Sequence, residues 1–179
     1  MSTTNVYAVW LGERHEEIAE FRNGHGSAPV VWGKMFARYV GASPGSRYPD
    51  SEYMFRTEEL WPLWKRMDIP KSFRAVLAIT YDNAYVTREN YARAAADIRA
   101  FLTGFDFNPE HVNHWPRIAE IFESNPDCPA IGFRWTSVCE DPFNGDWNEE
   151  IEDYDPPDWS KKWNVYEALD SLDAAEAQP

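Results

Sequence analysis

Four histidines and two cysteines are the residues of this 179-residue chain that could bind a metal or act as nucleophiles. His111 and His114 have the i, i+3 spacing that places two side chains on one face of a helix. Ten residues separate Cys128 from Cys139. Structural zinc sites use closely spaced cysteine pairs or the Cys–His spacing of a zinc finger, and neither pattern is present. The sequence therefore predicts two helix histidines, two unreactive thiols and no metal site.

Two loops have weaker catalytic potential. Gly24–Ser27 precedes an expected helix, but it lacks both the G-x-G-x-x-G spacing and the Lys-Ser/Thr pair of a phosphate-binding loop. Cys139–Asp141 ends an expected strand, and its two acidic side chains disfavour the thiolate that a cysteine nucleophile needs. An enzyme of unassigned reaction that uses these two loops is one alternative.

A strongly acidic segment, residues 140–158, is the most unusual stretch of the chain. It holds nine acidic residues and no lysine or arginine, and large apolar side chains are threaded among the acids. An acidic face kept only for solubility is the simplest alternative, but a solvating tail would be poor in aromatic residues, whereas tryptophan and tyrosine are enriched at protein interfaces. We therefore expect a binding surface with these members: Asp146, Trp147, Glu149, Glu150, Glu152, Asp153, Tyr154, Asp155, Asp158 and Trp159.

A calcium loop is the first alternative for this segment. Asn144, Asp146 and Asn148 alternate as EF-hand ligands do. However, the sixth position is Glu149 instead of glycine, and the twelfth is Asp155 instead of glutamate. The pattern therefore indicates no EF-hand, and we expect no cofactor.

Charge and composition limit the possible partners. The net charge is −13, and residues 136–179 carry 13 acidic residues against two lysines, whereas residues 1–135 are nearly balanced. This balance argues against direct binding to nucleic acid or to an anionic membrane. The chain has no apolar run of membrane-spanning length, no signal-peptide pattern and only two cysteines, so a cytoplasmic location is expected.

Hydrophobic periodicity predicts an α+β protein. Three strands are expected, and the nearly all-apolar second one should be central and pair with the third: Asn5–Leu11, Ser72–Tyr81 and Ala130–Cys139. Helices are expected over Glu13–Phe21, Ser27–Val40, a stretch from Thr57, Thr87–Thr103, a stretch from Asn108 that Pro116 interrupts, and a C-terminal helix from Ser160 that includes Trp163. Asp82–Val86 reads as a turn, and Asp173–Pro179 reads as a frayed tail.

Together these patterns predict a single domain over residues 1–179. A small sheet of about three strands packs against several helices and carries the irregular acidic segment. We expect a small inhibitor whose acidic surface imitates nucleic acid and blocks the basic, nucleic-acid-binding site of a partner protein. A phage-encoded anti-restriction or anti-CRISPR protein, acting in the host cytoplasm, is the most specific form of this expectation. An immunity protein against a basic toxin is a second alternative.

Overall fold

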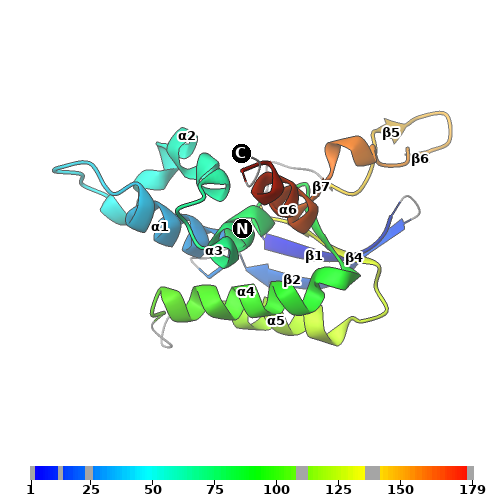
Figure 1. Ribbon diagram of the computed structural model, residues 1–179. Coiled ribbons are helices and arrows are strands. Elements are labelled where there is room, and N and C mark those ends of the chain that lie inside the picture. The colour runs from blue at the N-terminus through cyan, green and yellow to red at the C-terminus, as the bar shows by residue number, and fades with distance from the viewer. Residues whose placement is uncertain (1–2, 12–13, 23–25, 108–112, 136–141, 177–179) are drawn as a thin grey trace.

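The computed structural model describes residues 3–11, 14–22, 26–107, 113–135 and 142–176 as a compact mixed α/β fold (Figure 1). Within these residues a five-stranded sheet packs against helices, and a two-stranded sheet stands apart. The strands are β1 (Thr3–Trp10), β2 (Arg14–Arg22), β3 (Ala84–Thr87), β4 (Ala130–Arg134), β5 (Trp147–Asn148), β6 (Asp153–Tyr154) and β7 (Trp163–Asn164). The α-helices are α1 (Ala28–Tyr39), α2 (Thr57–Leu60), α3 (Lys71–Ile79), α4 (Tyr91–Gly104), α5 (Trp115–Ser124) and α6 (Val165–Glu176).

The main sheet has the strand order β2-β1-β4-β3-β7. Neighbouring strands are antiparallel except for β3 and β7, which run parallel. The fold class predicted from the sequence is confirmed. The expectation of about three strands is too low, because β2 carries mostly charged residues, and β3 and β7, with four and two residues, are too short for periodicity to reveal them.

The two faces of the main sheet are covered differently. Val6 and Ala8 of β1 belong to the main core, which the helices fill. Tyr7 and Val9, which alternate with them along the strand, belong to a small second cluster on the opposite face. Phe143, just before the two-stranded sheet, completes this second cluster. The acidic segment is thus attached to the face that the main core does not use.

Helix α1 follows its sequence signals closely. Ser27 is the N-cap residue, Pro29 lies in the first turn, and the chain leaves the helix at Gly41 with a φ of +85°. Helix α5 begins at Trp115 with Pro116 in its first turn, so this proline starts the helix instead of kinking it. The predicted start at Asn108 lies outside the described residues.

The helix predicted over Glu13–Phe21 is wrong, because Arg14–Arg22 forms strand β2. Its glutamates and alanine favour a helix locally, but antiparallel pairing with β1 along the whole strand overrides that preference. As an edge strand, β2 can carry charged side chains that would be costly in the middle of a sheet.

The central strand predicted over Ser72–Tyr81 is also wrong. Lys71–Ile79 is helix α3, and every residue from Phe73 to Ile79 is buried. A short, nearly all-apolar run is typical of both a buried strand and a buried helix, and periodicity cannot separate the two. Consequently α3 is not a neighbour of β4 in the sheet; β4 pairs with β1 and β3 instead.

The ends of three other elements differ from the predictions. Residues predicted as a turn form β3, so α4 begins only at Tyr91. Strand β4 ends at Arg134, and the expected extension toward Cys139 falls largely outside the described residues. The C-terminal helix begins at Val165, because Trp163 pairs with β3 as part of β7. Helix α6 continues through Glu176, so the described part of the predicted tail is helical.

Candidate functional site

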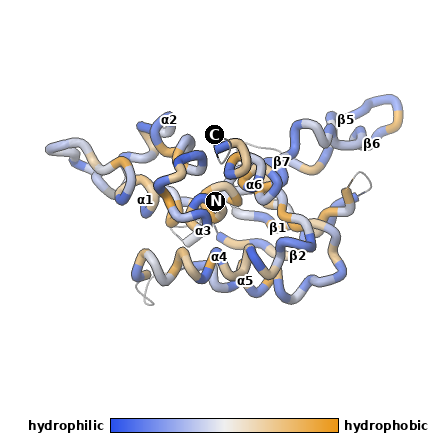
Figure 2. Tube along the Cα trace, viewed as in Figure 1, coloured by the Kyte–Doolittle hydropathy of each residue, from blue (hydrophilic) through white to orange (hydrophobic). Residues whose placement is uncertain are grey.

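Within the acidic segment, residues 146–155 fold as a β-hairpin that projects from the body of the protein, at the opposite end from α1 and α2 (Figure 1). Trp147 of β5 lies opposite Tyr154 of β6. Below this pair, Gly145 N donates to Asp155 O and Asp155 N donates to Asp146 O, both at 2.9 Å. We call residues 146–155 the acidic hairpin. It is hydrophilic along most of its length (Figure 2).

Side chains of the hairpin itself stabilise its shape. The Asn148 amide donates to Asp155 Oδ1 at 2.9 Å, and Asn148 Oδ1 accepts from Glu150 N at the same distance. This second contact is an Asx turn, which closes the loop at the tip. At the base, a side chain on Gly145 would overlap the carbonyl of Asp155, so glycine allows the two chains to approach.

Phe143 anchors the hairpin on the sheet. Its side chain is 1% exposed and packs edge-on against Tyr7, with ring centroids 5.6 Å apart. It also lies directly over Gly132, where any side chain would overlap its ring. On the other side of the hairpin, Trp159 packs edge-to-face against Tyr85 at 5.8 Å. The acidic hairpin is therefore held at its base by two aromatic residues.

Large apolar side chains are exposed on the hairpin. Trp147, Ile151 and Tyr154 are 54%, 60% and 46% exposed, respectively. The Trp147 and Tyr154 rings contact each other edge-to-face at 5.2 Å across the two strands. Exposed aromatic residues held in one arrangement are typical of protein-binding surfaces, where they bury large areas at little cost in side-chain entropy.

The carboxylates around these rings have no cationic partner in the part of the chain that the structure describes. No ion pair among the described residues involves the hairpin's six acidic side chains, which are those of Asp146, Glu149, Glu150, Glu152, Asp153 and Asp155. All of them are exposed except Asp155, which is half-buried. Their mutual repulsion decreases when a cationic surface approaches, and this favours a basic partner.

Two residues of the predicted surface have a different environment. Asp158 accepts hydrogen bonds from the backbone and hydroxyl of Ser160 and lies 3.5 Å from Lys161 Nζ. The hydroxyl, the backbone amide and Lys161 lower the pKa of Asp158. Trp159 is half-buried against Tyr85. Both residues thus support the base of the hairpin more than its exposed tip.

The structure adds residues that the sequence did not single out as site residues. Ile151 is at the tip, and its place between three glutamates was a usable signal. Phe143 and Tyr7 were not recognisable as an anchor, because their contact depends on a pairing between distant parts of the chain. The loop alternative involving residues 24–25 and 139–141 lies outside the described residues.

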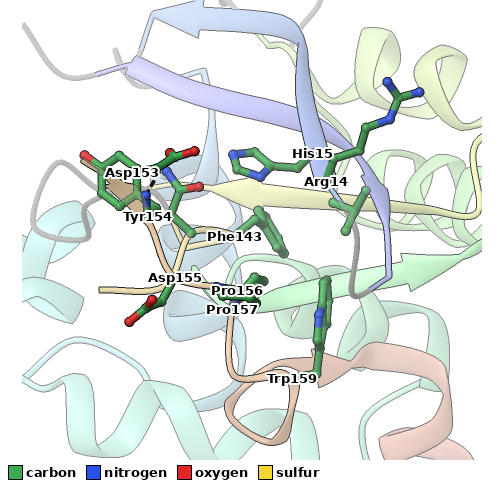
Figure 3. A pocket seen from close by; sticks show the side chains of 11 residues that line it. Arg14, His15, Phe143, Asp153, Tyr154, Asp155, Pro156, Pro157 and Trp159 are labelled. Carbon is green, nitrogen blue, oxygen red and sulfur yellow. Dashed lines mark hydrogen bonds between the residues drawn. The ribbon is translucent and has the colours of Figure 1, made fainter. Parts of the chain in front are cut away.

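A cavity of about 280 Å³ lies at the base of the acidic hairpin (Figure 3). Asp153, Tyr154 and Asp155 line one side of it, and Trp159 lies on the opposite side. Arg14 and His15 come from the start of β2. His15 packs edge-on against Tyr7, with ring centroids 5.4 Å apart. The cavity therefore connects the hairpin to the edge of the main sheet.

A second cavity of about 290 Å³ is lined by Trp64, Tyr81 and Trp163. The Trp163 ring contacts the Trp64 and Tyr81 rings edge-to-face, and burial raises the pKa of Tyr81. One acidic and one basic side chain, those of Asp82 and Lys161, also line this cavity. The described residues contain no group of three or more histidine, cysteine or acidic side chains that could hold a metal ion, and no helix long and apolar enough to cross a membrane.

Comparisons with protein-family models, curated proteins and solved structures find no match to this chain.

Proposed function

We propose that this protein binds the basic surface of a partner protein through the acidic hairpin and blocks the nucleic-acid-binding site there. The proposal is carried by one observation: an anchored hairpin exposes two aromatic rings among carboxylates that have no ion-pair partner in the described residues. Charge alone would also fit a solvated surface. The exposed Trp147 and Tyr154 rings argue for an interface, because a surface kept only for solubility does not need them.

The chemistry of the hairpin supports a partner that normally binds phosphates. Carboxylates spread over a fixed scaffold present negative charge to a basic groove, as a nucleic-acid backbone does. A complementary charge field also steers association and disfavours acidic partners. Inhibitors of the anti-restriction or anti-CRISPR type are the most specific form of this proposal. An immunity protein would use the same surface, so the nature of the bound partner distinguishes the two forms.

The proposal is tested by comparing two variants with equal changes in charge. The hairpin variant replaces four hairpin acids by lysine: Glu149, Glu150, Asp153 and Asp155. The control variant makes the same replacement at four exposed acids on the body that form no ion pair within the described part of the chain: Glu20, Glu58, Asp127 and Glu176. Each protein is immobilised and exposed to a nuclease-treated lysate, and captured partners are then purified.

The decisive readout is inhibition of the purified partner. We expect the unmodified chain and the control variant to displace a labelled oligonucleotide from the partner, and the hairpin variant to lose this ability. Reversing several attractive contacts removes each attraction and adds a repulsion. A hairpin variant with unchanged thermal stability that still displaces the oligonucleotide would contradict the proposal.

A further inference from the structure

The cavity at the base of the acidic hairpin has the size of a binding site for one side chain. Pockets that enclose drug-sized ligands occupy roughly 300–1,000 Å³. At about 280 Å³, this cavity lies below that range. Asp153 and Asp155 of the acidic hairpin line it, so a partner that docks on the hairpin would bring its side chains beside the cavity (Figure 3).

The charges around the cavity favour a cation. Asp153 and Asp155 line it, and neither belongs to an ion pair among the described residues. Arg14 and His15 are the basic side chains that line the opposite side. The Arg14 guanidinium stacks over the Trp10 ring at 4.4 Å from the centroid, and Figure 3 shows it pointing away from the hairpin residues. Arg14 therefore does not neutralise the two carboxylates.

The apolar walls favour a flat cation over a compact one. Phe143 and Trp159 contribute aromatic rings, and Pro156 and Pro157 contribute rigid apolar surface. A guanidinium is planar, stacks on aromatic rings and pairs with two carboxylate oxygens at once, whereas an ammonium is strongly hydrated and behaves as a point charge. Flat walls beside two carboxylates thus match arginine better than lysine.

We propose that this cavity receives an arginine side chain of the partner, which stacks on the aromatic wall and pairs with Asp153 and Asp155. The inference rests on the proposed function, since the arginine would be one that the partner otherwise uses to bind phosphate. It adds a specific subsite to that function, because the tip of the hairpin has no cavity of this kind among those described.

The subsite can be tested without the partner, with N-acetyl-arginine amide as the probe. The side-chain N–H signals of the tryptophans are followed by NMR during titration, with the Trp159 signal assigned from a Trp159→Phe variant. At about 0.15 M salt, where charges are screened beyond about 8 Å, we expect a saturable shift of the Trp159 signal and little shift of the Trp147 signal. N-acetyl-leucine amide serves as the neutral control.

Two matched double variants locate the binding. Asp153→Asn with Asp155→Asn removes both charges and keeps one acceptor oxygen on each side chain, and we expect it to weaken probe binding about fivefold. Glu149→Gln with Glu150→Gln removes the same charge at the tip, and we expect less than about a twofold effect. Equal effects of the two variants, no saturable Trp159 shift, or equal binding of N-acetyl-lysine amide would each contradict the subsite.

Failure of the subsite proposal can be distinguished from failure of the proposed function. If the subsite alone is wrong, the probe does not bind, but the hairpin variant still loses inhibition of the partner. If the proposed function alone is wrong, the probe binds at Trp159 while the hairpin variant inhibits the partner as the unmodified chain does.

Discussion

Two groups of carboxylates in the last quarter of the chain differ in what balances their charge. On α6, Asp170 lies 2.7 Å from Lys71 and 2.9 Å from Arg93, and Asp173 lies 2.9 Å from Arg74. These ion pairs connect α6 to α3 and α4, and we call them the α6 network. The Arg74 side chain is only 4% exposed, so Asp173 balances a buried charge.

The acidic hairpin shows the opposite arrangement. Its carboxylates have no ion pair among the described residues, and its aromatic rings face outward. Each carboxylate contributes the same charge in either group. Those of the α6 network form ion pairs within the fold, whereas those of the acidic hairpin are available to a partner. The comparison teaches that ion pairing, and not acidity, separates structural carboxylates from those of a candidate interface.

The largest expected effect concerns the anchor of the hairpin. Phe143→Ala removes a buried ring from the sheet, and we expect the free energy of unfolding to fall by about 3–5 kcal/mol in urea titrations. Trp147→Ala, which truncates an exposed ring in the same segment, should change it by less than about 0.5 kcal/mol. Equal losses in the two variants would mean that the hairpin is not divided into a buried base and an exposed tip.

Affinity for the partner should depend on the exposed tip of the hairpin more than on its buried base. We expect Trp147→Ala to weaken association with the partner by about 2 kcal/mol, the magnitude typical of an aromatic hot spot. Tyr48→Ala, at another exposed aromatic residue outside the hairpin, is the matched control and should leave affinity unchanged. Isothermal titration calorimetry measures both. An effect of Tyr48→Ala as large as that of Trp147→Ala would remove the special role of the hairpin.

The α6 network should control stability without affecting binding. Asp170→Asn combined with Asp173→Asn leaves the buried Arg74 without its ion-pair partner, and we expect a loss of about 1–2 kcal/mol in unfolding free energy. Glu149→Gln combined with Glu150→Gln should cost no stability, because neither residue belongs to an ion pair in the described part of the chain. Chemical unfolding of the two double variants compares the regions directly.

A smaller effect is expected with pH. Hydrogen bonds from Arg93 and Lys71 lower the pKa of Asp170 to about 2 in the folded protein, below its ordinary value of about 3.9. The folded state therefore binds fewer protons here than the unfolded state, and the resulting stability is present above about pH 4 and is lost as the pH falls toward about 2. Glu52, whose pKa the Ser43 hydroxyl and Arg56 also lower to about 2, acts in the same direction.

Thermal unfolding between about pH 5 and pH 2 measures this dependence. Asp170→Asn should reduce the slope of melting temperature against pH in this range, whereas Glu149→Gln should leave that slope unchanged. An unchanged slope in the Asp170→Asn variant would show that the network contributes nothing to acid stability.

Local signals were enough for the parts of the fold that depend on local chemistry. Helix α1 was predictable because Pro29 and Gly41 mark its two ends. Strand β2 and helix α3 were not predictable in this way. Pairing with β1 determines the conformation of β2, and burial along nearly its whole length determines that of α3. Single-sequence periodicity contains neither kind of information.

The acidic segment was recognisable from its composition, but its division into a buried base and an exposed tip was not. Sequence alone placed Trp147 and Trp159 together in one surface, although one is exposed and the other packs against Tyr85. The base of the hairpin is held by a tertiary contact, that of the Phe143 ring with Gly132, eleven positions earlier in the sequence. The cavity beside Trp159 depends on the same tertiary contact.

The salt dependence of the purified complex tests the central claim most directly. Affinity for the partner is measured by fluorescence anisotropy at several salt concentrations for the unmodified chain, the control variant and the hairpin variant. The account predicts a steep loss of affinity with salt for the first two, because interacting surface charges are screened, and weak binding with little salt dependence for the hairpin variant. A hairpin variant that is folded and binds with the affinity and salt dependence of the unmodified chain would contradict it.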